Sequence, residues 1–304
     1  MARDPTFREA CKKALGGGIP GAIAMVLQVV LLMWLRTVIN VQMSTGGTFF
    51  GTIDALYKEG GIPRFYQGMW VALLQAPLSR FGDTAANAGV LSATNNWKWP
   101  IWLKTAMASL AAALWRIVIM PVDTCKTLLQ VHGSAASGVM MDRMAADGIM
   151  TLYAGASAAT LATFMGHYPW FATNNFLEAR VASFGDSKTA VNVRRALIGF
   201  CCSFVSDCIS NSTRVVKTYC QTSKEPVGYL EAVVLIVSKD GIGGLLWRGL
   251  AAKLLCNGLG SILFSVVWKI LMEKGYFDFS RTPTNPGSRA QEPDPKKGDA
   301  GRGV

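Results

Sequence analysis

The residues best suited to chemistry in this sequence are Asp123 and Lys126, which stand between Pro121 and Gln130. Residues three positions apart share a helix face, so this carboxylate and ammonium group can pair with each other or with partners on neighbouring helices. Proline removes a backbone donor, so Pro121 predicts a bend directly before the charged pair. The pattern therefore predicts an acid and a base on one helix face, directly after a bend.

Catalytic and metal-binding chemistry finds little support. The only histidines are His132 and His167, and neither has a cysteine or carboxylate at a metal-ligand spacing. The seven cysteines form no disulfide framework and no C-x-x-C redox site, so they are predicted to be small apolar residues within helices. No glycine-rich phosphate loop precedes a helix. We therefore expect neither an enzyme nor a bound cofactor.

The composition favours a membrane protein, with a soluble two-domain helical protein as the alternative. Of the 304 residues, 51% are hydrophobic and only 16% charged. The longest uncharged run, residues 14–35, is long enough to span a hydrocarbon core of about 30 Å. Further spans are predicted near residues 68–95, 101–131, 155–183, 193–221 and 249–274. These spans carry charges, and a charge facing lipid costs at least ~2.5 kcal/mol, so the charges should face a polar interior.

The elements that must position these residues recur three times. A predicted helix ends at Gln42, Gln130 and Gln221, an acidic–glycine pair follows, and the next apolar run opens at Gly68, Gly155 and Gly249. An amphipathic stretch between the two long runs predicts a short helix at the membrane surface. The predicted fold is all-α, with six transmembrane helices in three pseudo-threefold repeats at 1–95, 96–185 and 186–279. Residues 280–304 are predicted to form a polar tail that is disordered or docked to a partner.

One segment resembles the signature of the mitochondrial carrier family: Pro121-Val-Asp123-Thr-Cys-Lys126-Thr-Leu-Leu-Gln130, followed by Asp147-Gly148 and Tyr153-Ala-Gly155. The resemblance extends over most of the chain. It implies transport of a small-molecule solute and a place in the mitochondrial inner membrane, with both termini in the intermembrane space. It also implies a matrix-side gate in which acids and bases of neighbouring repeats pair and the three glutamines brace the pairs.

Only the second repeat carries the whole gate motif. Aligned on the glutamines, the third repeat has Ser212, Arg214 and Lys217 where proline, acid and base are expected, and the first has Met33, Leu35 and Val38. In the family each acid pairs with the base of the following repeat. The resemblance thus implies an Asp123–Lys217 bridge, while Lys126 would face Leu35 and Arg214 would face Val38. The charged end of the cavity that this pattern implies either attracts anions, or forms a gate that is partly open or fixed and whose charges are hydrated.

Substrate contacts in the family lie seven and eight residues after the opening glycine, at Gln75, Ala76, Ala162, Thr163, Cys256 and Asn257 in this chain. None of these is charged. Twelve residues after the glycine come Arg80, His167 and Ser261. Arg80 is the best candidate for binding an anion, because a guanidinium group binds carboxylate or phosphate through two hydrogen bonds. The alternative is a pair with Asp83, and His167 is expected to be a buried, hydrogen-bonded histidine.

The family places a second gate, a tyrosine followed by an acid, further along the even-numbered helices. The equivalent positions are Asn87-Ala88, Asn174-Asn175 and Trp268-Lys269, so no ion-pair gate is expected there.

The net charge of +11 is not gathered into a basic run with interleaved aromatic residues, so nucleic acid is not expected as a partner. Anionic lipid is the better candidate. Gly68, Gly155 and Gly249 open helices whose free N–H groups can bind a lipid phosphate, and the family binds cardiolipin there. Arg248 would assist at the third position.

Two functions follow from these patterns. The first is alternating-access transport of a small anionic or polar metabolite. The second is a carrier fold that has lost transport and serves as a structural subunit of a respiratory complex or supercomplex. The degenerate gate motifs, the missing second gate and the uncharged contact positions favour the second.

Overall fold

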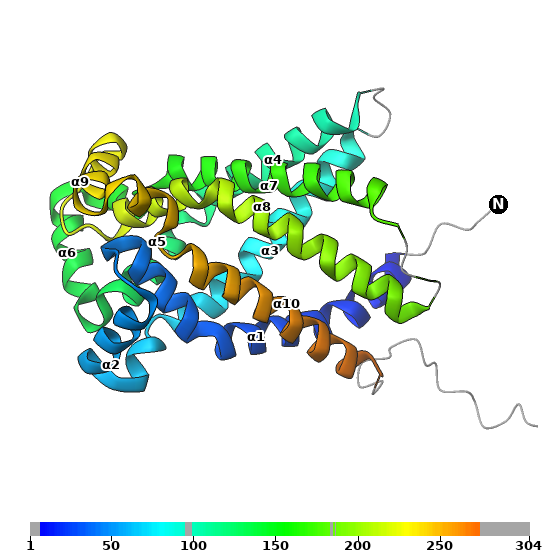
Figure 1. Ribbon diagram of the computed structural model, residues 1–304, viewed down its shortest axis with the longest axis horizontal. Helices are drawn as coiled ribbons and strands as arrows, with labels where there is room; N and C mark the ends of the chain where they lie inside the picture. The colour runs from blue at the N-terminus through cyan, green and yellow to red at the C-terminus, as the bar shows by residue number, and fades with distance from the viewer. Residues whose placement is uncertain (1–6, 95–98, 183–184, 186, 274–304) are drawn as a thin grey trace, which may run out of the picture.

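The computed structural model is a bundle of long helices with shorter helices gathered at one end (Figure 1). It describes residues 7–94, 99–182, 185 and 187–273, so the predicted tail at 280–304 lies outside the described residues. All regular structure in these ranges is helical, which confirms the predicted all-α class.

The helices follow one order three times: long, short, long. The first group is α1 (Phe7–Thr45), α2 (Phe49–Phe65) and α3 (Met69–Ala93). The second is α4 (Ile101–Val118) continued by α5 (Met120–His132), then α6 (Ala136–Asp147) and α7 (Ala156–Arg180). The third is α8 (Lys188–Thr222), α9 (Tyr229–Trp247) and α10 (Leu250–Glu273). The short helices α2, α6 and α9 lie together at the left end of Figure 1.

Two segments of the described chain are long and apolar enough to cross a membrane by length and composition. They are Ile23–Thr45 in α1 and Met120–Arg180, which runs from α5 to α7. Six crossings and a threefold repeat of the sequence stay predictions.

Proline interrupts one long helix and leaves two others continuous. α4 ends at Val118, and α5 begins directly after Ile119 with Pro121 in its first turn, so the predicted span 101–131 is two helices. Pro77 and Pro169 lie inside α3 and α7, which continue through them. The first turn of α5, directly after this break, carries Asp123.

The opening glycines pack tightly against the long helix of the next group. Gly68, Gly155 and Gly249 all have positive φ values, 80°, 79° and 67°, which favour glycine. A Cβ on Gly68 would lie 3.3 Å from a carbonyl oxygen of α5, one on Gly155 2.9 Å from a carbonyl of α8, and one on Gly249 3.1 Å from a carbonyl of α1. These positions therefore hold the three groups in close backbone contact.

Three buried arginines, which we call the arginine staples, tie each short helix to the C-terminal end of the next long helix. Arg64 donates to the carbonyls of Gln130 and Val131 at 2.8 and 2.6 Å. Arg143 donates to the carbonyls of Gln221 and Cys220 at 2.6 and 3.3 Å, and Arg248 to that of Ser44 at 3.4 Å. Carbonyls at helix ends have no partner within the helix, so each staple satisfies groups that burial would otherwise leave unpaired.

The contact between α1 and α8 is mainly apolar. One core cluster joins Leu35, Ile39 and Met43 of α1 to Val215 and Val216 of α8, and all five are buried. A buried hydrogen bond of 2.6 Å between the hydroxyl groups of Ser44 and Thr222 closes the same contact at its end.

Candidate functional site

A polar cavity of about 360 Å³ lies between the long helices. Its wall includes six cationic side chains from the five helices α1, α4, α5, α8 and α10: Arg36, Arg116, Lys126, Arg214, Lys217 and Lys253. Three carboxylates pair with them, namely Asp83, Asp123 and Asp207. The described cavity and its paired acids therefore carry a surplus of three positive charges.

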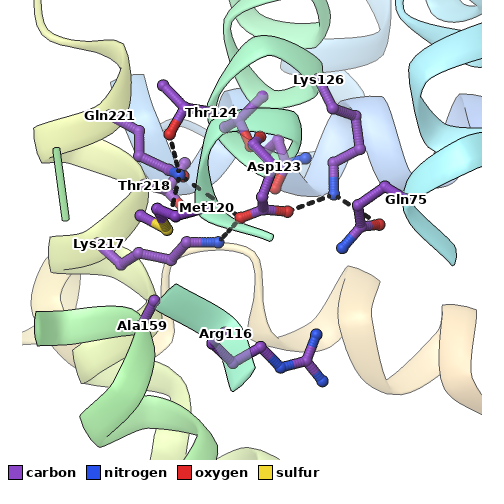
Figure 2. Close-up of polar contacts among 12 residues, drawn as sticks. Gln75, Arg116, Met120, Asp123, Thr124, Lys126, Ala159, Lys217, Thr218 and Gln221 are labelled. Carbon is purple, nitrogen blue, oxygen red and sulfur yellow. Dashed lines mark hydrogen bonds and ion pairs between the residues drawn. The ribbon is translucent and has the colours of Figure 1, made fainter. Parts of the chain in front are cut away.

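Asp123 forms the centre of the charge cluster at one end of this cavity. Figure 2 shows its carboxylate between two ammonium groups, with Lys126 on one side and Lys217 on the other. The Lys126 Nζ donates to Asp123 Oδ1 at 2.9 Å and to Gln75 Oε1 at 3.4 Å. Lys217 of α8 donates to the other oxygen, so the bridge implied by the resemblance is present. The Asp123 side chain is only 10% exposed, which strengthens both ion pairs.

The glutamines at the helix ends take three different roles. Gln221 donates to Asp123 Oδ2 at 3.5 Å and to Thr124 Oγ1 at 3.1 Å, so it braces the ion pair (Figure 2). Gln130 accepts a hydrogen bond from Asn40 of α1. Gln42 instead donates to the carbonyl of Gly47, just beyond its own helix, at 3.2 Å. Among the described residues, only the α5–α8 contact at this end of the cavity is ionic.

The expectation that Lys126 faces Leu35 and Arg214 faces Val38 was wrong. Leu35 packs in the α1–α8 core, and Val38 packs on Leu56 and Phe65 of α2. Burying a charge against such surfaces without a partner is costly, so both cations turn into the polar cavity instead. Lys126 shares Asp123 with Lys217, and the Arg214 Nε donates to Ser210 Oγ at 3.1 Å.

Most predicted substrate-contact residues line the cavity. These are Gln75, Thr163, His167 and Asn257. Ser261 is not part of the wall; its hydroxyl donates to the carbonyl of Asn257 at 2.9 Å. The side chain of Arg80 lies outside the described residues, and so do those of Asn87, Ala88, Trp268 and Lys269.

His167 differs from its prediction. It is half-buried on the cavity wall and stands edge-on to Phe171, with 6.5 Å between ring centres. It lies one helical turn beyond Thr163 on the same face of α7, which turns the ring toward the cavity rather than into the core.

Two cross-links in the cavity wall were not predicted as pairs. Arg116 holds Asp83 of α3, with 2.9 Å between Nη2 and Oδ2, and also donates to Ser79. Asp207 of α8 binds Lys253 of α10 at 2.8 Å and accepts from Asn257. The sequence placed these charges within apolar spans, but their pairing depends on helix rotation that spacing alone does not give.

Arg248 does not fit the lipid-binding role expected for it. Its side chain is 3% exposed, pairs with Asp240 at 2.6 Å and donates to the end of α1. A guanidinium held inward by a carboxylate and a carbonyl is not free to meet a lipid headgroup. The glycine helix starts remain as candidates for that role.

Among the described residues, no group of three or more His, Cys, Asp or Glu side chains could hold a metal ion. The described cysteines are free, and Cys202, Cys220 and Cys256 are buried.

Comparisons with known proteins agree with this architecture. The family described as "Mitochondrial carrier protein" matches residues 98–183 and 188–275, more than half of the chain. The chain is also similar to "Protein MITOFERRINLIKE 1, chloroplastic" of Arabidopsis thaliana, with 27% identity over 288 residues. That match covers 89% of this chain and 62% of the relative's length. The predicted resemblance is confirmed: the chain belongs to the mitochondrial carrier family, whose members are transporters and not enzymes.

Proposed function

We propose that this protein carries a small, negatively charged solute through the central cavity. The observation that carries the proposal is the charge of the wall, because its six cations pair with only three carboxylates, of which Asp123 alone lines the described cavity. Low-dielectric walls lined by one sign of charge concentrate ligands of the opposite sign.

Two of the cavity cations are free to bind such a solute. Within the part of the chain that the structure describes, Arg36 and Arg214 have no carboxylate within ion-pair distance. Guanidinium groups bind carboxylates and phosphates through paired hydrogen bonds. Neutral donors and acceptors on the same wall, including Gln75, Thr163 and Asn257, supply the polar contacts that orient a ligand.

A metal cation is a weaker candidate, suggested by the name of the Arabidopsis relative. The surplus of positive charge opposes the entry of a cation. The described cavity wall also offers only scattered soft ligands, such as His167 and Cys256, and a single carboxylate that already holds two lysines.

A structural role without transport is the second candidate function. It is favoured by the α1–α8 contact, which is an apolar core where other carriers are expected to have an ion pair. The side chains of an apolar contact do not exchange partners as readily as those of an ion pair do. The α1–α8 contact would therefore hold this end of the cavity closed.

We further propose that the protein lies in the mitochondrial inner membrane, with α2, α6 and α9 on the matrix side and both termini in the intermembrane space. The arrangement of the short helices at one end of the bundle supports this placement (Figure 1). Cardiolipin is proposed to bind at the helix starts after Gly68 and Gly155, where backbone N–H groups are available.

The test is uptake into liposomes that contain the purified protein, with radiolabelled phosphate, di- and tricarboxylates, nucleotides and ferrous iron as separate arms. We expect uptake of at least one anion, and Arg36→Gln should reduce it at least tenfold. The matched control is Arg195→Gln, which removes an exposed guanidinium outside the cavity wall. Uptake of iron alone would overturn the assignment of an anion. Uptake of no solute, with co-purification of a large membrane complex, would establish the structural role instead.

A further inference from the structure

We propose that the anion bound in the central cavity carries a hydroxyl group, and that Asn257 is the residue that selects for this hydroxyl. The substrate class is then a small hydroxycarboxylate. This inference rests on the proposed function, because it concerns the solute of the same cavity. It is drawn from neutral side chains of the cavity wall whose orientation is fixed by their neighbours.

The side-chain amide of Asn257 is held in one orientation by Asp207 of α8. Asn257 Nδ2 donates to one oxygen of this carboxylate, and the other oxygen pairs with Lys253 Nζ at 2.8 Å. A carboxylate has only acceptors, so the amide nitrogen must face it and the carbonyl oxygen is turned away. No hydrogen bond from the described residues reaches Asn257 Oδ1. Because Asn257 is exposed on the cavity wall, this oxygen is presented to a solute as an acceptor.

Thr163 of α7 supplies a second acceptor on the wall. Its hydroxyl donates to the carbonyl of Ala159, one turn earlier in the same helix, at 2.8 Å. A hydroxyl has a single hydrogen, so Thr163 in this arrangement can only accept from a solute. Thr163 and Asn257 each follow the opening glycine of their helix, Gly155 or Gly249, by eight residues. Both therefore lie about 12 Å along the helix axis from that end of the bundle.

Gln75 of α3 has the opposite character. Lys126 Nζ donates to Gln75 Oε1 at 3.4 Å (Figure 2). An ammonium group has only donors, so it fixes the amide with its oxygen toward the lysine and leaves the amide nitrogen to donate. Gln75 follows Gly68 by seven residues, which places it at a similar depth, about 10 Å from the same end. These three side chains thus offer a solute one neutral donor and two acceptors.

A carboxylate without a further polar group does not match this set. Its oxygens can accept from Gln75 and from the guanidinium groups of the wall, but they cannot donate to Asn257 or Thr163. A hydroxyl group on the solute supplies the missing hydrogen. An ammonium group would also donate, but the surplus of positive charge in the cavity opposes its entry. A hydroxycarboxylate therefore satisfies both the charge and the hydrogen-bonding groups of the wall.

The experiment compares malate with succinate, two dianions at neutral pH that differ by one hydroxyl group. The melting temperature of the purified protein in detergent is titrated with each compound at constant pH and ionic strength, which gives an apparent dissociation constant. We expect malate to bind about tenfold more tightly, a modest factor because water in the open cavity replaces the missing hydroxyl in part. Lactate and propionate form a second matched pair, for which we expect the same order.

Asn257→Leu removes the amide and keeps a side chain of similar size. It should weaken the binding of malate to within about twofold of succinate. Binding of succinate should be unchanged, which also shows that the variant folds. The matched control is Asn175→Leu, the same change at an exposed position of α7 outside the cavity wall, which should keep the preference for malate. If Asn257→Leu does not fold, Thr163→Val removes the second acceptor and should lower the preference at least about threefold.

Equal binding of malate and succinate by the unmodified protein would overturn the proposal. Tighter binding of aspartate than of malate would overturn it too, because the donor would then be an ammonium group. Inorganic phosphate also carries a hydroxyl at neutral pH, so tighter binding of phosphate than of malate would assign an inorganic solute instead.

Uptake into liposomes distinguishes this inference from the proposed function. Uptake of malate and succinate with equal efficiency would leave anion transport standing while the inference fails. A preference for malate in binding, without uptake of any solute, would leave the inference standing while the proposed function fails. Stabilisation by none of these anions, together with no uptake, would overturn both.

Discussion

Removing the charge of Asp123 should destabilise the closed end of the cavity more than any other single isosteric change there. Asp123→Asn keeps the size of the side chain but leaves Lys126 and Lys217 facing each other without a counter-charge. Breaking a buried ion pair by neutralising one partner costs 3–5 kcal/mol. We expect about 3 kcal/mol, the lower end of that range, because the two lysines keep 16% and 19% exposure and can recruit water.

The assay is thermal unfolding of the purified protein in lipid-detergent micelles, followed by tryptophan fluorescence. A loss of about 3 kcal/mol corresponds to a fall of roughly 6–12 °C, at about 2–4 °C per kcal/mol. The matched control is Asp54→Asn. Asp54 pairs with Lys58 on α2, but their side chains are 61% and 73% exposed, so its loss should cost under about 0.5 kcal/mol. Equal melting temperatures for the two variants would refute the reasoning.

Lys126→Gln offers a second check on the shared carboxylate. It removes one of two like charges and leaves the Asp123–Lys217 bridge in place. We therefore expect it to lower the melting temperature by less than half as much as Asp123→Asn does. A larger fall would show that Lys217 alone does not hold Asp123.

Three further changes test the packing of the bundle by the same unfolding assay. Arg143→Leu leaves two buried carbonyls of α8 unsatisfied and should cost about 2–4 kcal/mol, whereas Arg195→Leu at an exposed position should change stability by less than about 0.5 kcal/mol. Gly155→Ala forces a side chain into positive φ with its Cβ 2.9 Å from a carbonyl of α8 and should cost at least about 1 kcal/mol. Gly138→Ala, in a helix with nothing within 4 Å, should instead gain about 0.5–1 kcal/mol. Leu35→Ala opens a cavity in the α1–α8 core and should cost about 2–5 kcal/mol. An unchanged melting temperature in any variant predicted to be destabilised would contradict the contact assigned to that residue.

The sequence predicted the helices well, because their signals are local. The bend at Pro121 and the helix starts after Gly68 and Gly155 follow from the backbone limits of proline and glycine. To predict the ion pair between Asp123 and Lys217, the register of the second repeat against the third also had to be known. The resemblance to the carrier family gave that register.

The other contacts of the site could not be predicted, because they depend on how each helix is rotated about its axis. Val38 was placed opposite Arg214 by counting along the chain, but the rotation of α1 turns it toward α2. The Arg116–Asp83 and Asp207–Lys253 pairs join different helices, and no spacing within either helix distinguishes a partner from a neighbour. The arginine staples were missed because Arg64, Arg143 and Arg248 stand at different distances from their acidic–glycine pairs, so no shared offset marks them.

The arginine staples have a consequence for how this bundle comes apart. Arg64 joins the first group to the second, Arg143 the second to the third, and Arg248 the third back to the first, so the three links form a closed circuit. When one link is cut, the other two still hold the freed ends near each other at high effective concentration. When a second link is cut, one helix group is left without a staple. Loss of two staples should therefore lower the free energy of unfolding by more than the sum of the two single losses. Such non-additivity would show that the three links are energetically coupled.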